Sequence, residues 1–84
     1  MVAVTLYGTR FCSFCSAAKQ LLTSKGIIFD DISLDSDLEL RIEIMEKSGQ
    51  RTVPQIWIGK MHVGGFSELR DLEVSGKLDA LLSS

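Results

Sequence analysis

The sequence has few of the residues that build metal sites and disulfide frameworks: two cysteines, one histidine and one proline among 84 residues. A structural zinc ion needs four ligands, usually from cysteine and histidine, and this chain offers only Cys12, Cys15 and His62. A disulfide between the two cysteines would close a four-residue loop and constrain the unfolded chain by only about 2 kcal/mol. Neither role explains the two thiols well.

Long hydrophobic runs and an excess of positive charge are also missing. No apolar stretch approaches the ~20 residues of a membrane span, and no basic region with a long apolar segment begins the sequence, so we expect neither a membrane partner nor a secretory signal. Nine basic and eleven acidic residues give a net charge of −2, which offers no basic surface for nucleic acid. Because free thiols are normal in a reducing compartment, we expect a cytoplasmic protein.

The remaining composition is that of an ordinary folded domain. Hydrophobic residues make up 45% of the chain and charged residues 24%. A chain of 84 residues can bury one modest core but not two. We therefore expect residues 1–84 to form a single domain.

The two cysteines lie three positions apart, directly after a short apolar segment. Residues 2–7 are predicted to form a strand, and residues 13–25 contain no glycine or proline and show helical spacing of apolar residues. A Cys12 sulfur at the first turn of this helix would face unpaired N–H groups and the positive end of the helix dipole, which favour a thiolate. Because residues i and i+3 share one side of a helix, the Cys15 sulfur can approach the Cys12 sulfur and form a reversible disulfide with it. The spacing thus predicts a redox pair, with Cys12 as nucleophile and Cys15 as resolving thiol.

The next segments alternate between strand and helix patterns. Residues 26–32 are predicted as a second strand. Ser36 followed by Glu39 forms a capping-box pattern, which predicts a helix that ends near Gly49. Its expected inner face is made of Leu38, Ile42 and Met45.

The last third of the chain predicts a hairpin and two helices. Residues 55–58 and 61–63 flank the two-residue turn Gly59-Lys60. Ser67 is expected to cap a helix, and a short apolar helix follows near the end. Trp57 is expected to pack on the sheet and His62 to be a half-exposed strand residue away from Cys12. The order β-α-β-α-β-β-α, with a short last helix, indicates an α/β fold.

Three segments in this order resemble the glutaredoxin family: Cys12-Ser13-Phe14-Cys15, Thr52-Val53-Pro54, and Gly64-Gly65-Phe66-Ser67-Glu68-Leu69. The resemblance covers residues 2–82. It implies a thioredoxin-like fold, in which a four-stranded mixed sheet is flanked by helices. It also implies a glutathione-dependent thiol–disulfide oxidoreductase, monomeric, that reduces glutathione mixed disulfides and protein disulfides. Ribonucleotide reductase is a protein partner implied by the resemblance alone.

The resemblance also implies where glutathione binds. A cis bond at Pro54 would turn the backbone of Val53 toward glutathione, and the N–H groups of Ser67 and Glu68 would hold its γ-glutamyl carboxylate. Gly65 would leave room for that approach, and Arg51 would pair with the glycine carboxylate. The glutathione-binding residues implied in this way are Arg10, Phe14, Arg51, Thr52, Val53, Pro54, Gly65, Phe66, Ser67 and Glu68.

Two positions depart from the family pattern. Family members usually carry a lysine two or three residues before the first cysteine, whereas this chain has Thr9-Arg10-Phe11, so either Arg10 replaces that charge or the charge is absent. Ser13 replaces the proline of the commonest dithiol form. Because some family members with serine there bind a [2Fe–2S] cluster, an alternative is a cluster-bridged dimer with Cys12 and glutathione from each subunit as ligands.

Overall fold

A mixed sheet of four strands, in the order β2-β1-β3-β4, forms the centre of the fold. The computed structural model describes residues 2–83. The elements in chain order are β1 (Val4–Gly8), α1 (Ser13–Ser24), β2 (Asp30–Ser33), α2 (Leu38–Ser48), β3 (Gln55–Ile58), β4 (Met61–Gly64), α3 (Phe66–Val74) and α4 (Lys77–Ser83). β1 pairs parallel with β2 and antiparallel with β3, which pairs antiparallel with β4. The predicted element order and mixed sheet are confirmed.

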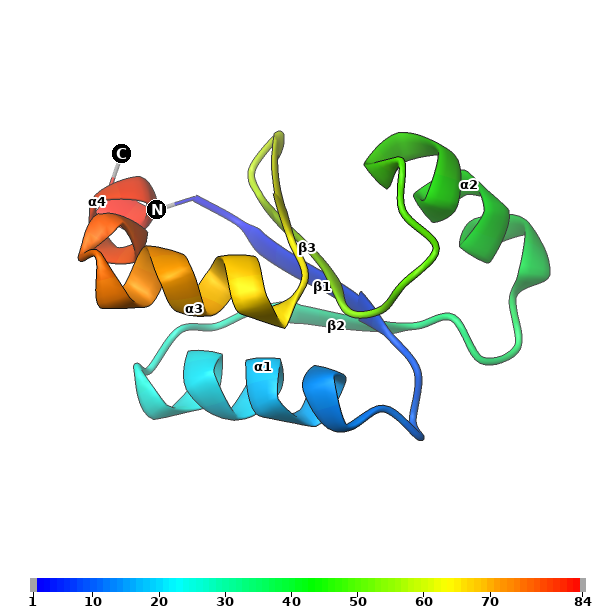
Figure 1. Cartoon of the computed structure of the whole chain (residues 1–84), viewed down its shortest axis with the longest axis horizontal. Coiled ribbons are helices and arrows are strands. Elements are labelled where there is room, and N and C mark those ends of the chain that lie inside the picture. The colour runs from blue at the N-terminus through cyan, green and yellow to red at the C-terminus, as the bar shows by residue number, and fades with distance from the viewer. Residues whose placement is uncertain (1, 84) are drawn as a thin grey trace.

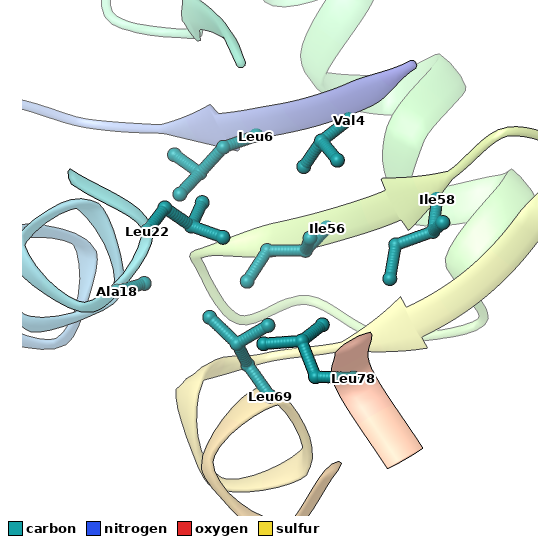
Figure 2. Packing of buried hydrophobic residues seen from close by; sticks show 8 residues of the cluster. All are labelled: Val4, Leu6, Ala18, Leu22, Ile56, Ile58, Leu69 and Leu78. Carbon is teal, nitrogen blue, oxygen red and sulfur yellow. The ribbon is translucent and has the colours of Figure 1, made fainter. Parts of the chain in front are cut away.

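The hydrophobic core lies between one face of this sheet and the helices α1, α3 and α4 (Figure 1). Alternate residues of a strand point to the same face, so β1 and β3 each contribute two side chains to the core. Figure 2 shows the cluster, in which each side chain is at most 5% exposed: Val4, Leu6, Ala18, Leu22, Ile56, Ile58, Leu69 and Leu78. Full burial of one large aliphatic side chain contributes about 1.5–3 kcal/mol, so this cluster anchors α1 and α3 to the sheet.

An ion-pair cluster adds a polar link between the same helices. The Lys25 ammonium, which follows α1, lies 2.8 Å from Glu73 of α3 and 3.0 Å from Asp79 of α4. Hydrogen bonds to Glu73 and then Asp79 raise the pKa of Lys25. The lysine therefore remains charged and connects the C-terminal end of α1 to α3 and α4.

The second strand is shorter than predicted. Residues 26–32 were expected to be extended, but β2 contains only Asp30–Ser33. Gly26 has a φ of +71°, and the Ile27 N–H donates to the Leu22 carbonyl, so these residues complete the end of α1. The side chain of Ile28 is 85% exposed.

The second helix begins one residue later and faces differently than predicted. Asp37, not Ser36, caps α2, because its carboxylate accepts the Leu40 N–H at 3.0 Å. The buried residue is Ile44, whereas Leu38 and Ile42 are 70% and 43% exposed. The predicted inner face was therefore wrong for Leu38 and Ile42, whereas Met45 is half-buried.

The third helix also begins earlier than predicted. Its N-cap is Gly65, and Ser67 is the second helical residue. The Glu68 carboxylate accepts the Gly65 N–H at 2.7 Å, which satisfies a donor at the helix start without Ser67. The prediction that Ser67 caps the helix was wrong.

The hairpin agrees with the prediction. β3 and β4 are joined at Gly59-Lys60, and the φ of Gly59 is +59°. Trp57 lies on the sheet in edge-to-face contact with Tyr7, with ring centroids 5.5 Å apart. Within residues 2–83, every helix is too short or too polar to cross a bilayer.

Candidate active site

The N-terminal ends of α1 and α3 point toward the same end of the sheet, where the loop between α2 and β3 passes them (Figure 1). This arrangement follows from the core, because α1 and α3 pack on one face of the sheet with their first turns at the same end of it. Each helix presents N–H groups without intrahelical partners there, together with the positive end of its dipole. Three segments meet at this end of the sheet: the one that carries Cys12, Thr52-Val53-Pro54, and Phe66-Ser67.

Cys12 is the N-cap of α1. Its backbone is extended (φ −138°, ψ 109°), and its carbonyl accepts the first intrahelical bond from Ser16 N–H at 3.1 Å. Its Sγ accepts the Cys15 N–H at 3.2 Å and lies 3.6 Å from the Val53 carbonyl oxygen. This confirms the predicted placement of the first sulfur at a helix start, where a thiolate gains a hydrogen-bond donor.

Cys15 has a different environment although it is only three residues away. Its side chain is 1% exposed, and both cysteines are free thiols. Burial raises the pKa of the Cys15 thiol to about 11, and its hydrogen bond with Cys12 acts in the same direction. The half-buried Cys12 is therefore the accessible sulfur, and Cys15 remains a protonated thiol beneath it.

Gly8, the last residue of β1, provides the space for Cys15. A Cβ atom at Gly8 would lie 2.9 Å from the Cys15 Sγ, closer than carbon and sulfur can pack. Any side chain here would therefore displace the second sulfur. Sequence analysis did not identify this role of Gly8, because a contact between β1 and α1 leaves no mark on local sequence.

A shallow hollow of about 160 Å³ opens between the start of α1, the loop before β3 and the start of α3. The peptide bond between Val53 and Pro54 is cis, as the resemblance implied. The rings of Phe14 and Phe66, which line the same hollow, stack with centroids 6.3 Å apart. The lining consists of eight of the residues that the family resemblance implied for glutathione binding: Phe14, Thr52, Val53, Pro54, Gly65, Phe66, Ser67 and Glu68.

Two glycines shape the α3 side of this hollow. Gly64 has a φ of +118°, and a Cβ there would lie 2.6 Å from the Glu68 carboxylate. A Cβ at Gly65 would lie 3.3 Å from the Pro54 carbonyl oxygen. The first intrahelical bond of α3 runs from Leu69 N–H to Gly65 O, so the three N–H groups before Leu69 have no intrahelical acceptor. These N–H groups are suited to hold an anion.

The two predicted arginines lie beside other hollows. The Arg10 N–H donates to Asp35 at 3.1 Å, and the Arg10 guanidinium lies 5.1 Å from the centroid of the Phe11 ring. Arg51 borders a hollow lined by residues of α2 and the following loop. The structure thus brings eight of the ten predicted glutathione-binding residues to one hollow and leaves these two outside it.

A buried polar network, which sequence reasoning missed, fixes the loop before β3. The side chain of Gln55 is fully buried, and its Nε2 donates to the Thr52 carbonyl and to Gln50 Oε1, each at 2.9 Å. Its Oε1 lies 2.7 Å from His62 Nε2 on β4. The available signal was a glutamine directly after Pro54, at the start of an apolar strand. His62 belongs to this network and not to the surroundings of Cys12.

Within residues 2–83, no three histidine, cysteine, aspartate or glutamate residues come together in a way that could hold a metal ion. Because Cys15 is buried, Cys12 is the one accessible thiol that this part of the chain could offer to a [2Fe–2S] cluster. The remaining ligands would have to come from outside the chain. These residues do not form a cluster site by themselves.

Comparison with known proteins identifies a family. A sequence profile described as glutaredoxin matches residues 4–63. Over 84 residues, covering all of both chains, the sequence is 54% identical to a glutaredoxin from Pseudomonas aeruginosa. It is 42% identical to glutaredoxin 3 from Escherichia coli over 82 residues, which are 98% of this chain and 99% of that protein.

Solved structures agree with this result. The solution structure of a Brucella melitensis glutaredoxin, 49% identical, superposes with a TM-score of 0.88 over 98% of this chain and 89% of that one. A buckwheat glutaredoxin–glutathione complex, 28% identical, superposes with a TM-score of 0.90 over 98% of this chain and 77% of that one. The predicted thioredoxin-like fold is confirmed. The comparisons favour the oxidoreductase over the [2Fe–2S] alternative. The chain therefore belongs to the glutaredoxins, a family of glutathione-dependent thiol–disulfide oxidoreductases.

Proposed function

We propose that this glutaredoxin removes glutathione from glutathionylated proteins, with Cys12 as the nucleophile. The observation that carries the proposal is the position of the Cys12 Sγ at the start of α1, 3.2 Å from the Cys15 N–H and 3.6 Å from the Val53 carbonyl oxygen. A thiolate is the attacking species in disulfide exchange, and a helix start stabilises it. Of the two sulfurs, Cys12 is the one that a substrate can reach.

The reaction consists of two exchanges. The Cys12 thiolate attacks the glutathione sulfur of the mixed disulfide, the S–S bond breaks, and the protein thiolate leaves and takes a proton from water. The thiolate of a second glutathione then attacks the glutathione sulfur bound to Cys12. Oxidised glutathione leaves, and the Cys12 thiolate is regenerated.

The hollow beside Cys12 is the proposed binding site of the glutathionyl group. The cis peptide bond and the lining of the hollow support strand-like pairing of the Val53 backbone with the cysteine backbone of glutathione. The free N–H groups of Ser67 and Glu68 suit its γ-glutamyl carboxylate, and Gly65 keeps this approach open. Thr52 and the stacked rings of Phe14 and Phe66 complete the walls of the hollow.

Arg51 and Arg10 are the proposed cationic partners of the glycine carboxylate. Arg51 directly precedes Thr52, and Arg10 lies two residues before Cys12. Both side chains are exposed, so they can turn toward a ligand in the hollow without leaving a buried site. An exposed ion pair of this kind contributes about 0.2–1 kcal/mol.

For protein disulfides we propose that Cys15 resolves the intermediate. Cys12 attacks one substrate sulfur and forms a mixed disulfide, and Cys15 then attacks the Cys12 sulfur. The substrate thiolate leaves, and an intramolecular disulfide remains between Cys12 and Cys15, which two glutathione molecules reduce. Since Cys15 is buried, it must move slightly outward for this step, whereas exchange with a glutathione mixed disulfide does not require it.

Partners and compartment are further parts of the proposal. Free thiols at both cysteines suit the reducing cytoplasm. We propose a monomer whose partners are glutathione and oxidised proteins, with ribonucleotide reductase as one partner suggested by the family resemblance. No step of this scheme uses a [2Fe–2S] cluster.

A coupled assay tests the proposal. The substrate is the mixed disulfide of glutathione and 2-hydroxyethanethiol, and glutathione reductase with NADPH converts oxidised glutathione into a measurable loss of NADPH. We expect a rate that saturates with the mixed disulfide and is abolished in Cys12→Ser. A rate equal to that without protein would refute the proposed function.

A further inference from the structure

The proposed scheme uses only part of a surface offered by aromatic and cationic residues, which flank Cys12 in the sequence and lie on the first two turns of α3. The surface, here called the aromatic–arginine surface, consists of Arg10, Phe11, Phe14, Phe66 and Arg70. Phe11 is 90% exposed and Phe14 is 61% exposed, although both are large apolar side chains. Exposed apolar groups that gather around a reactive atom are typical of a docking surface.

Each end of this surface has an arginine against an aromatic ring. The Arg10 guanidinium lies 5.1 Å from the Phe11 centroid, and the Arg70 guanidinium lies 5.9 Å from the Phe66 centroid. Phe66 in turn stacks on Phe14, two residues after Cys12. Each cation therefore lies against an aromatic ring, and Phe14 and Phe66 also line the hollow beside Cys12.

The charges of this surface are available to a partner. The ion pairs found within residues 2–83 use Lys19, Lys25 and Lys47, and none of them includes an arginine. The nearby carboxylates of Asp35 and Glu68 instead accept backbone N–H groups, from Arg10 and Gly65 respectively. The chain as a whole carries a net charge of −2, so a cationic surface at the reactive end is a local feature.

We propose that the aromatic–arginine surface binds the protein half of the mixed disulfide and prefers segments in which acidic and apolar side chains flank the glutathionylated cysteine. A carboxylate would pair with Arg70, and an apolar side chain would cover Phe11. The inference rests on the proposed function, because it concerns which glutathionylated proteins reach Cys12. The inference assigns a role to Phe11 and Arg70, which are not part of the proposed glutathione-binding site.

Two glutathionylated peptides test this preference. Both carry leucine beside the modified cysteine, and one adds two aspartates where the other adds two lysines. We expect kcat/KM to be about tenfold higher for the acidic peptide at low ionic strength, and the ratio to fall as salt is added. Equal kcat/KM for the two peptides would overturn the inference.

Variants separate this surface from general charge effects. Arg70→Glu should reduce kcat/KM for the acidic peptide about threefold to tenfold and raise it for the basic peptide. Lys77→Glu makes the same charge change on α4, at the end of the molecule away from the start of α1, and should change neither value appreciably (Figure 1). Phe11→Ser should lower kcat/KM for both peptides. If Arg70→Glu and Lys77→Glu behaved alike, the inference would be wrong.

The small mixed disulfide with 2-hydroxyethanethiol distinguishes this inference from the proposed function. Arg70→Glu and Phe11→Ser should leave its turnover unchanged, because it has no protein half. Normal turnover of this substrate without discrimination between the peptides would overturn only the docking surface, whereas no turnover of any mixed disulfide would overturn both. A wild-type dimer in gel filtration that Phe11→Ser converts to a monomer would assign the surface to a second copy and overturn the inference.

Discussion

The backbone N–H of Cys15 donates to the Sγ of Cys12 across 3.2 Å, so the second cysteine supports the first through its main chain. Its own thiol is 1% exposed. The two sulfurs thus have separate tasks although they belong to one helical turn.

Alkylation should distinguish the two thiols. Because burial raises the pKa of Cys15 to about 11, this thiol stays protonated near neutral pH, and its reactivity should rise only as the pH approaches 11. We expect iodoacetamide at about pH 7–8 to modify Cys15→Ser, which retains Cys12, and to leave Cys12→Ser almost unmodified. Mass spectrometry of the intact variants over time measures both rates. Comparable rates in the two variants would show that the environments of the sulfurs are alike.

Gly8→Ala should destabilise the protein through its contact with Cys15. A Cβ at Gly8 would lie 2.9 Å from the Cys15 Sγ, and overpacking of this kind costs about 1–3 kcal/mol. Urea unfolding measures the loss. In a Cys15→Ala background the sulfur is absent, so the same substitution should cost less, with a coupling of at least about 0.5 kcal/mol. Additive effects of the two substitutions would mean that Gly8 does not act through Cys15.

Gln55→Leu should disturb the loop that carries Thr52 and the cis peptide bond. The substitution removes a donor to the Thr52 carbonyl and a partner of His62, and each buried polar group left unsatisfied costs about 1–3 kcal/mol. We expect lower stability in urea together with a higher KM for the small mixed disulfide. His62→Ala removes only one of these bonds and serves as the control, for which a smaller rise in KM is expected. An unchanged KM in Gln55→Leu would separate this network from the hollow.

Arg51→Ala tests the proposed ion pair with glutathione. Loss of an exposed pair worth about 0.2–1 kcal/mol should raise the apparent KM for glutathione about 1.4-fold to fivefold, with less effect at high salt. Arg41→Ala, an exposed arginine on α2, is the matched control and should leave KM unchanged. If the two variants had the same KM, Arg51 would have no part in binding glutathione.

The sequence predicted elements well where local signals marked their ends. Gly49 after the second helix and Gly59-Lys60 in the hairpin marked real boundaries, since both glycines have a positive φ. The inner face of α2 could not be predicted, because the segment contains two apolar rows, one with Leu38 and Ile42 and the other with Ile44. Only packing against the sheet decides which row is buried.

In the candidate site, too, some features could be predicted from local sequence and others could not. Its residues come from three sequence segments, and eight of the predicted residues line one hollow because the core aligns the starts of α1 and α3. The contributions of Gly8 and Gln55 were missed, since they depend on contacts between elements that are distant in the chain or on burial of a polar group. Local sequence contains neither kind of information.

The central claim is that Cys12 alone performs exchange with glutathione mixed disulfides, and comparing Cys12→Ser with Cys15→Ser in the coupled glutathione reductase assay tests it most directly. We predict that Cys12→Ser has no activity above the uncatalysed rate, whereas Cys15→Ser retains activity on the small mixed disulfide and loses most of its reduction of protein disulfides. Equal losses in both variants on the small mixed disulfide would contradict this division of labour.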